Sequence, residues 1–533
     1  MLQASENNFV FLIFVASFII SLFARFLPTV EIYIALFVML SAVFVFFFAQ
    51  FRLKLSYSFL PVILFVLAAL VIYHFSDYKY NVRNELYILL SSAILYLLNS
   101  LLKDNERKNI LFVLVFIAIL LSIYIFSAVA LSFILTNRFE VFLTKELHAM
   151  ICFLLCVLPL SFIFWKPGNK LYFYVSIALF LAIMLTKSIL ATTIASAQFC
   201  MFLFSVRNEL KIKPATIVSP FCLSFATNSI FLIKSRFFSL TFNTWLKLLP
   251  AAKENLLFGV GFGNCNSASS FFCGAEYTSN MFLKILIETG ILGTAAFIFV
   301  IIAFLANVLK KLECEQNKKV YFCILISLLS FLVYNFFNSS AFVSTNFLLL
   351  FFLLSYPTNV CVVEKRKTKV NFYCILAIFL PFSLAVSYPV YSSQNYKKAI
   401  TFINAQKYLS AEKEILKALK GDCLNPKYMS KLSDIYFIRY QTIANSNEYY
   451  LDLAIEAANE ALFLNKYKPY HYYQLSYLYK IKGNEQLSLK YINKALKIDA
   501  NNPLYKSFYN DFGKPSISIP ASSTTENIKI AYS

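Results

Sequence analysis

The sequence predicts an all-α, polytopic membrane protein: a bundle of thirteen transmembrane helices followed by a soluble domain of helical repeats. The chain of 533 residues is 59% hydrophobic and only 14% charged, whereas soluble globular proteins are about 25% charged. Apolar runs long enough to cross a bilayer recur from the N-terminus to Pro389. Beyond Pro389 the composition changes to Tyr, Lys, Ala and Asn, with helical periodicity.

Each of the thirteen apolar runs is expected to form one transmembrane helix. The first run lacks a basic n-region and a small-residue cleavage site, so we expect it to be retained. The ninth, which contains Pro220, Thr227 and Asn228, is the weakest. The runs cover residues 9–27, 31–50, 58–75, 84–102, 110–135, 147–165, 170–186, 189–206, 215–233, 280–308, 320–337, 341–356 and 370–390.

The distribution of Lys and Arg predicts the orientation of the bundle, because cytoplasmic loops are enriched in these residues. With the N-terminus inside, the cytoplasmic loops hold 18 of them and the short outer loops only five. The one long loop, residues 234–279, and the C-terminal region then lie outside. Much of the net charge of +21 is therefore a topology signal, and we expect no nucleic-acid partner.

Three sets of residues share one spacing in the C-terminal region. The second and third sets lie 34 residues apart, and an insertion near Asn445–Tyr450 explains why the first lies 43 residues before the second. A 34-residue period with mostly small residues resembles the tetratricopeptide repeat, in which antiparallel helices pack closely. We expect domains at 1–390 and 391–514, and a disordered tail at 515–533. The sets are Ala411, Ile415, Ala418; Ala454, Ala458, Ala461; and Ser488, Ile492, Ala495.

The long outer loop carries the first of two motifs. Arg236 and Trp245 precede the segment LLFGVGFGN, in which Gly259, Gly261 and Gly263 alternate with larger residues. We expect these three glycines to shape the loop.

The second motif, SNMFLKILIETGILG, follows at once and contains Asn280, Leu283, Glu288 and Gly290. Together the two motifs resemble the periplasmic loop and the His-Asn-x-x-Leu and Glu-x-Gly signature of the O-antigen ligase and polymerase family of membrane glycosyltransferases. A dozen or so spans, one long outer loop and a tetratricopeptide tail also resemble these ligases and the related protein O-oligosaccharyltransferases.

The chain departs from the family pattern at two places. Ser279 stands where ligases usually have histidine, and a serine cannot replace an imidazole as a base near neutral pH. Lys187 and Ser188 stand where many members have Ser-Arg-Gly, so a cation is kept there.

The resemblance implies transfer of a glycan from an undecaprenyl-diphosphate carrier to an acceptor hydroxyl, at the periplasmic face of a bacterial inner membrane. Charge accumulates on the diphosphate in the transition state, so fixed cations are required. Arg236 is the first candidate, Lys187 the second and Lys253 the third. No cofactor is implied, and the cysteine spacing gives no metal site.

Several groups are candidates for activating the acceptor hydroxyl. The motif places Ser279 and Asn280 at the reaction site, and with histidine absent either Glu276 or Glu288 could accept the proton. A dissociative transition state would need no strong base. A structural alternative for Glu288 is an ion pair with Lys284, which lies four residues earlier on the same helix face.

Cys265 and Cys273 both lie in the outer loop, close to the glycine motif. An oxidising compartment would allow them to form a disulfide that closes a small loop over the site.

Several functions share these parts. Ligation to lipid A core, transfer to protein and chain polymerisation all use a polyprenyl-diphosphate-linked glycan, and their acceptor is a lipid, a protein or the growing chain. A scaffold of another class would keep the fold, lose the chemistry and bind protein partners through the repeats. A transporter of the same lipid would need facing charges deep in the spans, and few are visible. Membrane lipids are partners in every case.

Overall fold

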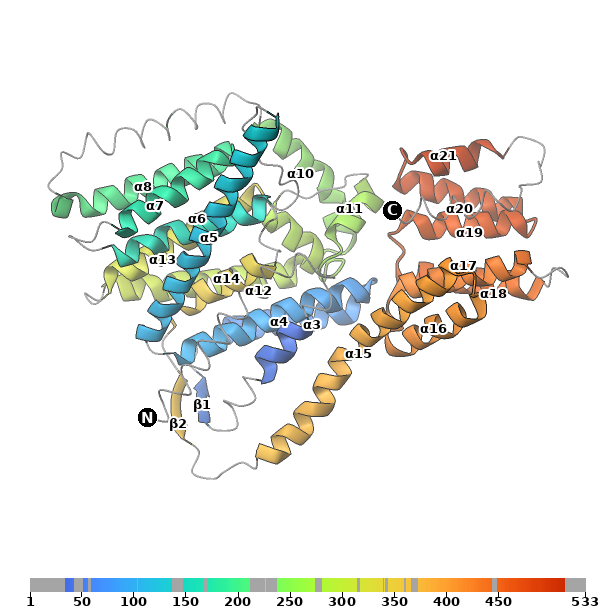
Figure 1. Ribbon diagram of the computed structural model, residues 1–533, viewed down its shortest axis with the longest axis horizontal. Coiled ribbons are helices and arrows are strands. Elements are labelled where there is room, and N and C mark those ends of the chain that lie inside the picture. Colours follow the sequence, from blue (N-terminus) through green and yellow to red (C-terminus); the bar gives the residue numbers. More distant parts are fainter. Residues whose placement is uncertain are drawn as a thin grey trace. The chain divides into compact units, whose positions relative to one another are not determined.

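The computed structural model describes residues 34–42, 51–55, 59–102, 104–136, 147–165, 171–210, 226, 237–273, 280–313, 317–338, 340, 344–358, 361–365, 372–442 and 448–512. The chain divides into two compact units (Figure 1). Unit 1 comprises residues 1–75, 83–263 and 277–383, and unit 2 comprises residues 76–82, 264–276 and 384–533. Residues 76–82, 264–276 and 391–533 of unit 2 come from parts of the chain that the charge distribution predicts to lie outside, and residues 384–390 belong to the last predicted span.

Unit 1 contains most of the apolar helices. Five helices of the described residues are long and apolar enough to cross a membrane: Lys79–Leu101, Asp104–Ile134, Leu147–Phe164, Met281–Glu313 and Lys318–Phe336. Each coincides with a predicted span. Predicted spans 9–27 and 215–233 (apart from residue 226) and the predicted tail 515–533 lie outside the described residues. The helices are α3 (Leu60–Phe75), α4 (Lys79–Leu101), α5 (Asp104–Thr136), α6 (Leu147–Ser161), η2 (Phe162–Phe164), α7 (Leu171–Leu185), α8 (Ile189–Leu210), α10 (Phe237–Glu254), α12 (Met281–Glu313), α13 (Lys318–Phe336) and α14 (Ser344–Ser355).

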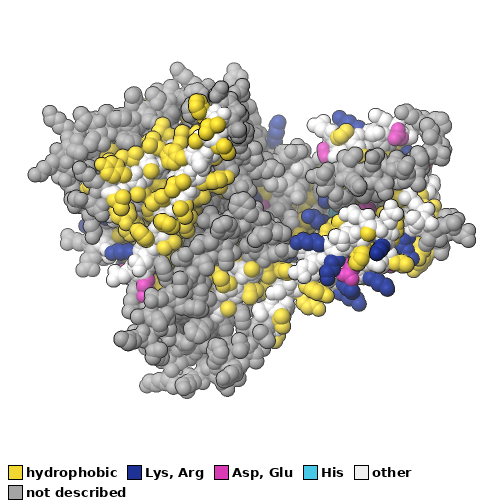
Figure 2. All heavy atoms as spheres, in the orientation of Figure 1, with side chains coloured by type: hydrophobic (Ala, Val, Ile, Leu, Met, Phe, Trp, Pro, Cys, Tyr) yellow, Lys and Arg dark blue, Asp and Glu magenta, His cyan; other side chains and the backbone are white. Residues whose placement is uncertain are grey.

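Helix α6 lies at the centre of unit 1, and almost all of its side chains are buried against α5, α7, α8 and α13. Polar side chains tie the neighbouring helices together: Gln198 on α8 donates to the Leu155 carbonyl of α6 at 2.9 Å and to the Ser330 hydroxyl of α13 at 2.5 Å. By contrast, α5 exposes a row of large apolar side chains, and Figure 2 shows a broad hydrophobic face over this helix. An apolar exterior around a polar-bonded interior suits a bilayer environment.

Among the described residues there is one pair of short strands, which the prediction of an all-α chain did not include. Strand β1 (Phe51–Leu55) pairs antiparallel with β2 (Cys361–Lys365), with Leu53 opposite Val363. Both strands lie in loops that the Lys and Arg distribution assigns to the cytoplasm. Their pairing requires the two loops to share one side of the bundle.

Unit 2 is built mainly from paired helices, shown in orange to red in Figure 1. Each of the nine residues in the three predicted sets is fully buried. The sets lie on α16, α18 and α20, at positions that face the interior of unit 2. The helices are α11 (Cys265–Cys273), α15 (Phe372–Asn404, which begins in unit 1), α16 (Tyr408–Gly421), α17 (Pro426–Thr442), α18 (Glu448–Leu464), α19 (Pro469–Ile481), α20 (Glu485–Ile498) and α21 (Pro503–Asn510).

One histidine is buried inside the helical repeats. His471 on α19 is 1% exposed, and neither ring nitrogen has a hydrogen-bond partner among the described residues. Burial, together with the nearby charge of Lys468, lowers the pKa of His471 to about 3. Charging this imidazole therefore opposes folding.

We predict that the repeat helices lose stability in acid because of His471. The folded pKa lies below the unfolded value of about 6.5, so the stabilisation is complete above that pH and declines as the pH falls. The free energy of unfolding should drop by about 1.4 kcal/mol per pH unit below about pH 6.5. Pulse proteolysis of the full-length chain in detergent, with a C-terminal tag to detect the repeats, measures this. The variant His471→Leu should show a much flatter dependence down to about pH 5, and parallel curves for the two proteins would contradict the prediction.

Candidate functional site

The second sequence motif forms a broken helix. Helix α12 runs from Met281 to Glu313 but is interrupted at Gly290, whose backbone has φ 62° and ψ −164°. This region of backbone space is available essentially to glycine alone. Two helical hydrogen bonds are lost at the break, from the Ile291 N–H to the Ile287 carbonyl and from the Leu292 N–H to the Glu288 carbonyl.

The glycine motif of the outer loop replaces these lost bonds. We call residues 256–263 the Gly loop. The N–H groups of Val260 and Gly261 donate to the carbonyls of Ile287 and Glu288, at 2.9 and 2.8 Å.

The exchange is reciprocal. On the other side of the break, the N–H groups of Ile291 and Leu292 donate to the carbonyls of Leu256 and Leu257, at 2.9 and 3.3 Å. Four bonds to the loop thus satisfy the groups that the break exposes. A lipid environment requires this, because unpaired backbone groups are costly there.

The close approach of the two backbones explains why glycine occupies both sides. A Cβ atom at Gly259 would collide with the main chain of Glu288 and Gly290, and one at Gly290 would collide with the carbonyl of Leu257. Gly259 also has a positive φ of 69°. The two motifs, predicted as neighbours in sequence, therefore form one structural unit.

A cluster of charged side chains lies at the first half of α12. Lys284 Nζ is 3.7 Å from Glu288 Oε1, and the Glu288 side chain is only 1% exposed. The structural alternative considered for Glu288, an ion pair with Lys284, is therefore present. Glu85 on α4, which is partly buried, interacts electrostatically with both Lys284 and Glu288. We call these three residues the Glu–Lys–Glu cluster.

Two carboxylates and one ammonium carry one net negative charge when all are ionised. In a buried setting such a cluster favours uptake of a proton, since an uncompensated charge is costly there. The cluster is therefore suited to accepting a proton from a bound hydroxyl. Sequence analysis missed Glu85. One feature of the sequence could have identified it: Glu85 is the second residue of the predicted span 84–102, and an ionisable group within a span is by default functional.

Other predicted site residues have different positions. Asn280 is buried, and its side-chain oxygen accepts a hydrogen bond from the Leu283 N–H at 3.0 Å. It therefore acts as the N-cap of α12. Lys187 is exposed at the turn between α7 and α8 and has a positive φ of 57°. Lys253 is exposed in the last turn of α10.

Helix α10 begins directly after Arg236 and is anchored by Trp245. The Trp245 ring lies 5.2 Å from Phe336 at 88° and 6.1 Å from Phe337 at 29°, which fixes the helix against the end of α13. Such ring pairs add about 0.5–1.5 kcal/mol each. Arg236, Glu276 and Ser279 themselves lie outside the described residues.

The two outer-loop cysteines are the first and last residues of α11 (Cys265–Cys273). Eight helical residues separate their Cα atoms by about 12 Å, beyond the span of a disulfide. The buried Cys265 thiol is not part of a disulfide and lies 3.8 Å from the Ser269 hydroxyl. The predicted disulfide is not formed because a helix holds the two residues apart.

No protein-family model and no curated protein matches this chain. The described residues contain no group of three or more His, Cys, Asp or Glu side chains that could hold a metal ion. The interpretation of the site therefore depends on its own geometry.

We predict that filling the contact between the loop and the broken helix destabilises the protein. Gly259→Ala and Gly290→Ala each add a backbone collision to an unfavourable φ, and each should cost about 3 kcal/mol or more. The matched control is Gly483→Ala, where φ is 81° but no atom lies within 4 Å of the added Cβ. It should cost only about 1 kcal/mol. Thermal unfolding of the purified variants in detergent tests this, and equal losses for all three would show that the collision does not matter.

Proposed function

We propose that this chain is a membrane glycosyltransferase that moves a glycan from a polyprenyl diphosphate to an acceptor hydroxyl at the outer face of a bacterial inner membrane. The observation that carries the proposal is the pairing of the Gly loop with the broken α12, which places the Glu–Lys–Glu cluster beside a satisfied but irregular backbone. Irregular backbone at membrane depth occurs where it lines a site or is buried in protein.

The proposed reaction is a displacement at the anomeric carbon. The acceptor oxygen forms a bond to this carbon as the bond to the diphosphate oxygen breaks, and the electron pair leaves with the diphosphate. Arg236 and Lys187 stabilise the charge that grows on the diphosphate. The acceptor proton passes to Glu85, the more accessible carboxylate, and Lys284 and Glu288 compensate its change of charge.

Glu85 also supplies a proton acceptor where the histidine of the resembling family is replaced by Ser279. A cluster of two carboxylates around one ammonium can serve as the proton acceptor that serine cannot provide. Glu288 then has a positioning role, because it is buried and directs the Lys284 ammonium. Ligation, transfer to protein and polymerisation remain the three forms of the proposed activity, and the helical repeats would provide the docking surface for a bulky acceptor.

We predict that Glu85→Gln lowers glycan transfer about a hundredfold or more, because an amide cannot accept the proton. Glu288→Gln should also lower transfer, through the loss of charge compensation at Lys284. The control is Glu456→Gln, an exposed residue on α18 that should keep full output. The measurement is glycan output in a deletion strain complemented with each variant, normalised to the amount of protein in the membrane.

The same gel separates polymerisation from the two forms that attach glycan to an acceptor when Arg236→Ala is included. Loss of acceptor-attached glycan identifies a ligase or protein transferase, and loss of the ladder alone identifies a polymerase. Full output of Arg236→Ala and Glu85→Gln at normal protein levels would contradict the transferase and favour a scaffold.

A further inference from the structure

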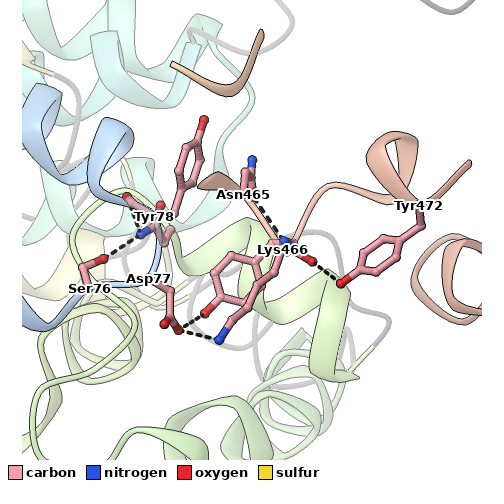
Figure 3. A network of polar contacts seen from close by, with 8 residues as sticks. Ser76, Asp77, Tyr78, Asn465, Lys466 and Tyr472 are labelled. Carbon is pink, nitrogen blue, oxygen red and sulfur yellow. Dashed lines mark hydrogen bonds and ion pairs between the residues drawn. The ribbon is translucent and has the colours of Figure 1, made fainter. Parts of the chain in front are cut away.

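The outer end of the Gly loop continues directly into unit 2. Gly263 is followed by Asn264, which begins the segment 264–276 of that unit. The Asn264 side-chain amide donates to the Ser76 hydroxyl at 3.4 Å and to the Tyr78 carbonyl at 3.3 Å. Residues 76–78, the outer turn between α3 and α4, are therefore fastened to the start of α11 (Figure 3).

The helical repeats hold this outer turn through one connector. Residues 465–467 join α18 to α19, and two of their side chains meet on one carboxylate. Lys466 Nζ lies 2.6 Å from Asp77 Oδ2, and the Tyr467 hydroxyl donates to the same oxygen at 3.2 Å (Figure 3).

The Lys466–Asp77 ion pair is about half exposed, with side-chain exposures of 44% and 42%, so it contributes little by itself. Tyr467 is 2% exposed and is the stronger contact. Its burial, with the adjacent Asp77 carboxylate, raises the pKa of Tyr467 far above its ordinary value, and the hydroxyl remains a donor.

The same tyrosine holds α11. Its ring lies 5.5 Å from the ring of Phe271 at 81° and 6.2 Å from that of Phe272 at 65°, the edge-to-face geometry that aromatic rings prefer. Phe271 also packs against the last core cluster of the repeats, which includes Ile492 and Phe508. Helix α11 is thus held both by the connector and by the repeat core.

The connector is rigid enough to act as a clamp. The Asn465 side-chain oxygen accepts the Tyr467 N–H at 3.1 Å, and the Tyr472 hydroxyl donates to the Lys466 carbonyl at 2.9 Å. Both bonds lie within residues 465–472, so they fix the connector independently of its contacts with α11 and the outer turn.

We propose that the connector 465–467, with Tyr467 as its central residue, is a positioning element that fixes the outer end of the Gly loop by clamping α11 and the outer turn. The inner part of the loop is fixed by its bonds to α12. With its inner part and its outer end both held, the Gly loop keeps a fixed position against α12. This inference rests on the proposed function only where it concerns glycan transfer; the clamp itself is independent of the reaction.

Hydrogen exchange on the full-length chain in nanodiscs tests the clamp without any substrate. Tyr467→Ala should speed exchange in α11 and the outer turn by about tenfold or more, because its buried ring contacts and its hydrogen bond are both lost. Asp77→Ala leaves the ring contacts with α11 in place, so it should speed exchange in the outer turn. Tyr467→Phe keeps the ring contacts but loses the hydroxyl, so it should speed exchange in the outer turn alone. Tyr449→Ala, a 60% exposed tyrosine on α18, is the matched control and should change neither segment.

Asp77→Ala alters no residue of the repeats. If Tyr467→Ala unfolds the repeats, exchange in the outer turn of Asp77→Ala still tests the clamp. Unchanged exchange in the outer turn for Asp77→Ala and Tyr467→Phe would overturn the clamp. Faster exchange with unaltered glycan output would overturn its positioning role. A wild-type chain without glycan output would instead refute the proposed function and leave the exchange result standing.

Discussion

The backbone exchange between the Gly loop and the break in α12 is the contact on which the rest of the site depends. A helix that opens at Gly290 exposes carbonyls at 287 and 288 and N–H groups at 291 and 292, and the loop binds all four. Because the two backbones touch, side chains are excluded from Gly259 and Gly290. The break in turn ends the first segment of α12 just after Glu288, which fixes the place of the Glu–Lys–Glu cluster.

This arrangement joins two requirements that usually conflict. A transferase at the membrane surface needs charged groups in fixed positions, and an apolar surrounding makes each such group expensive. Pairing Lys284 with Glu288 on one helix face reduces the free-energy cost of burying these charges. Glu85 from α4 adds a second carboxylate, which can accept and release a proton. In the proposed reaction, the Glu–Lys–Glu cluster takes the role of the histidine that the resembling family carries at the position of Ser279.

The sequence predicted long apolar helices and buried small residues correctly, because both follow from local patterns in the chain. Apolar runs predicted the long helices, and the 34-residue spacing identified positions such as Ala411, Ala454 and Ser488 that are fully buried. The strand pair β1–β2 and the electrostatic interaction of Glu85 with Lys284 and Glu288 were missed, since both join segments far apart in the chain. The sequence also placed Cys265 and Cys273 in a loop, where the structure has a helix that keeps them apart. Residues 76–82 and 264–276 belong to unit 2 through Asp77 and Phe271, whose partners no local pattern reveals.

Use of a polyprenyl diphosphate held by Arg236 and Lys187 is the central claim, and a photoreactive polyprenyl diphosphate tests it most directly. Purified full-length chain in nanodiscs is labelled with this probe, and the labelled peptides are mapped by mass spectrometry. The account predicts labelling concentrated in residues 234–293 and at Lys187, and its removal by excess unlabelled polyprenyl diphosphate. Labelling spread over the lipid-facing surface of α5 and unaffected by the competitor would contradict the account.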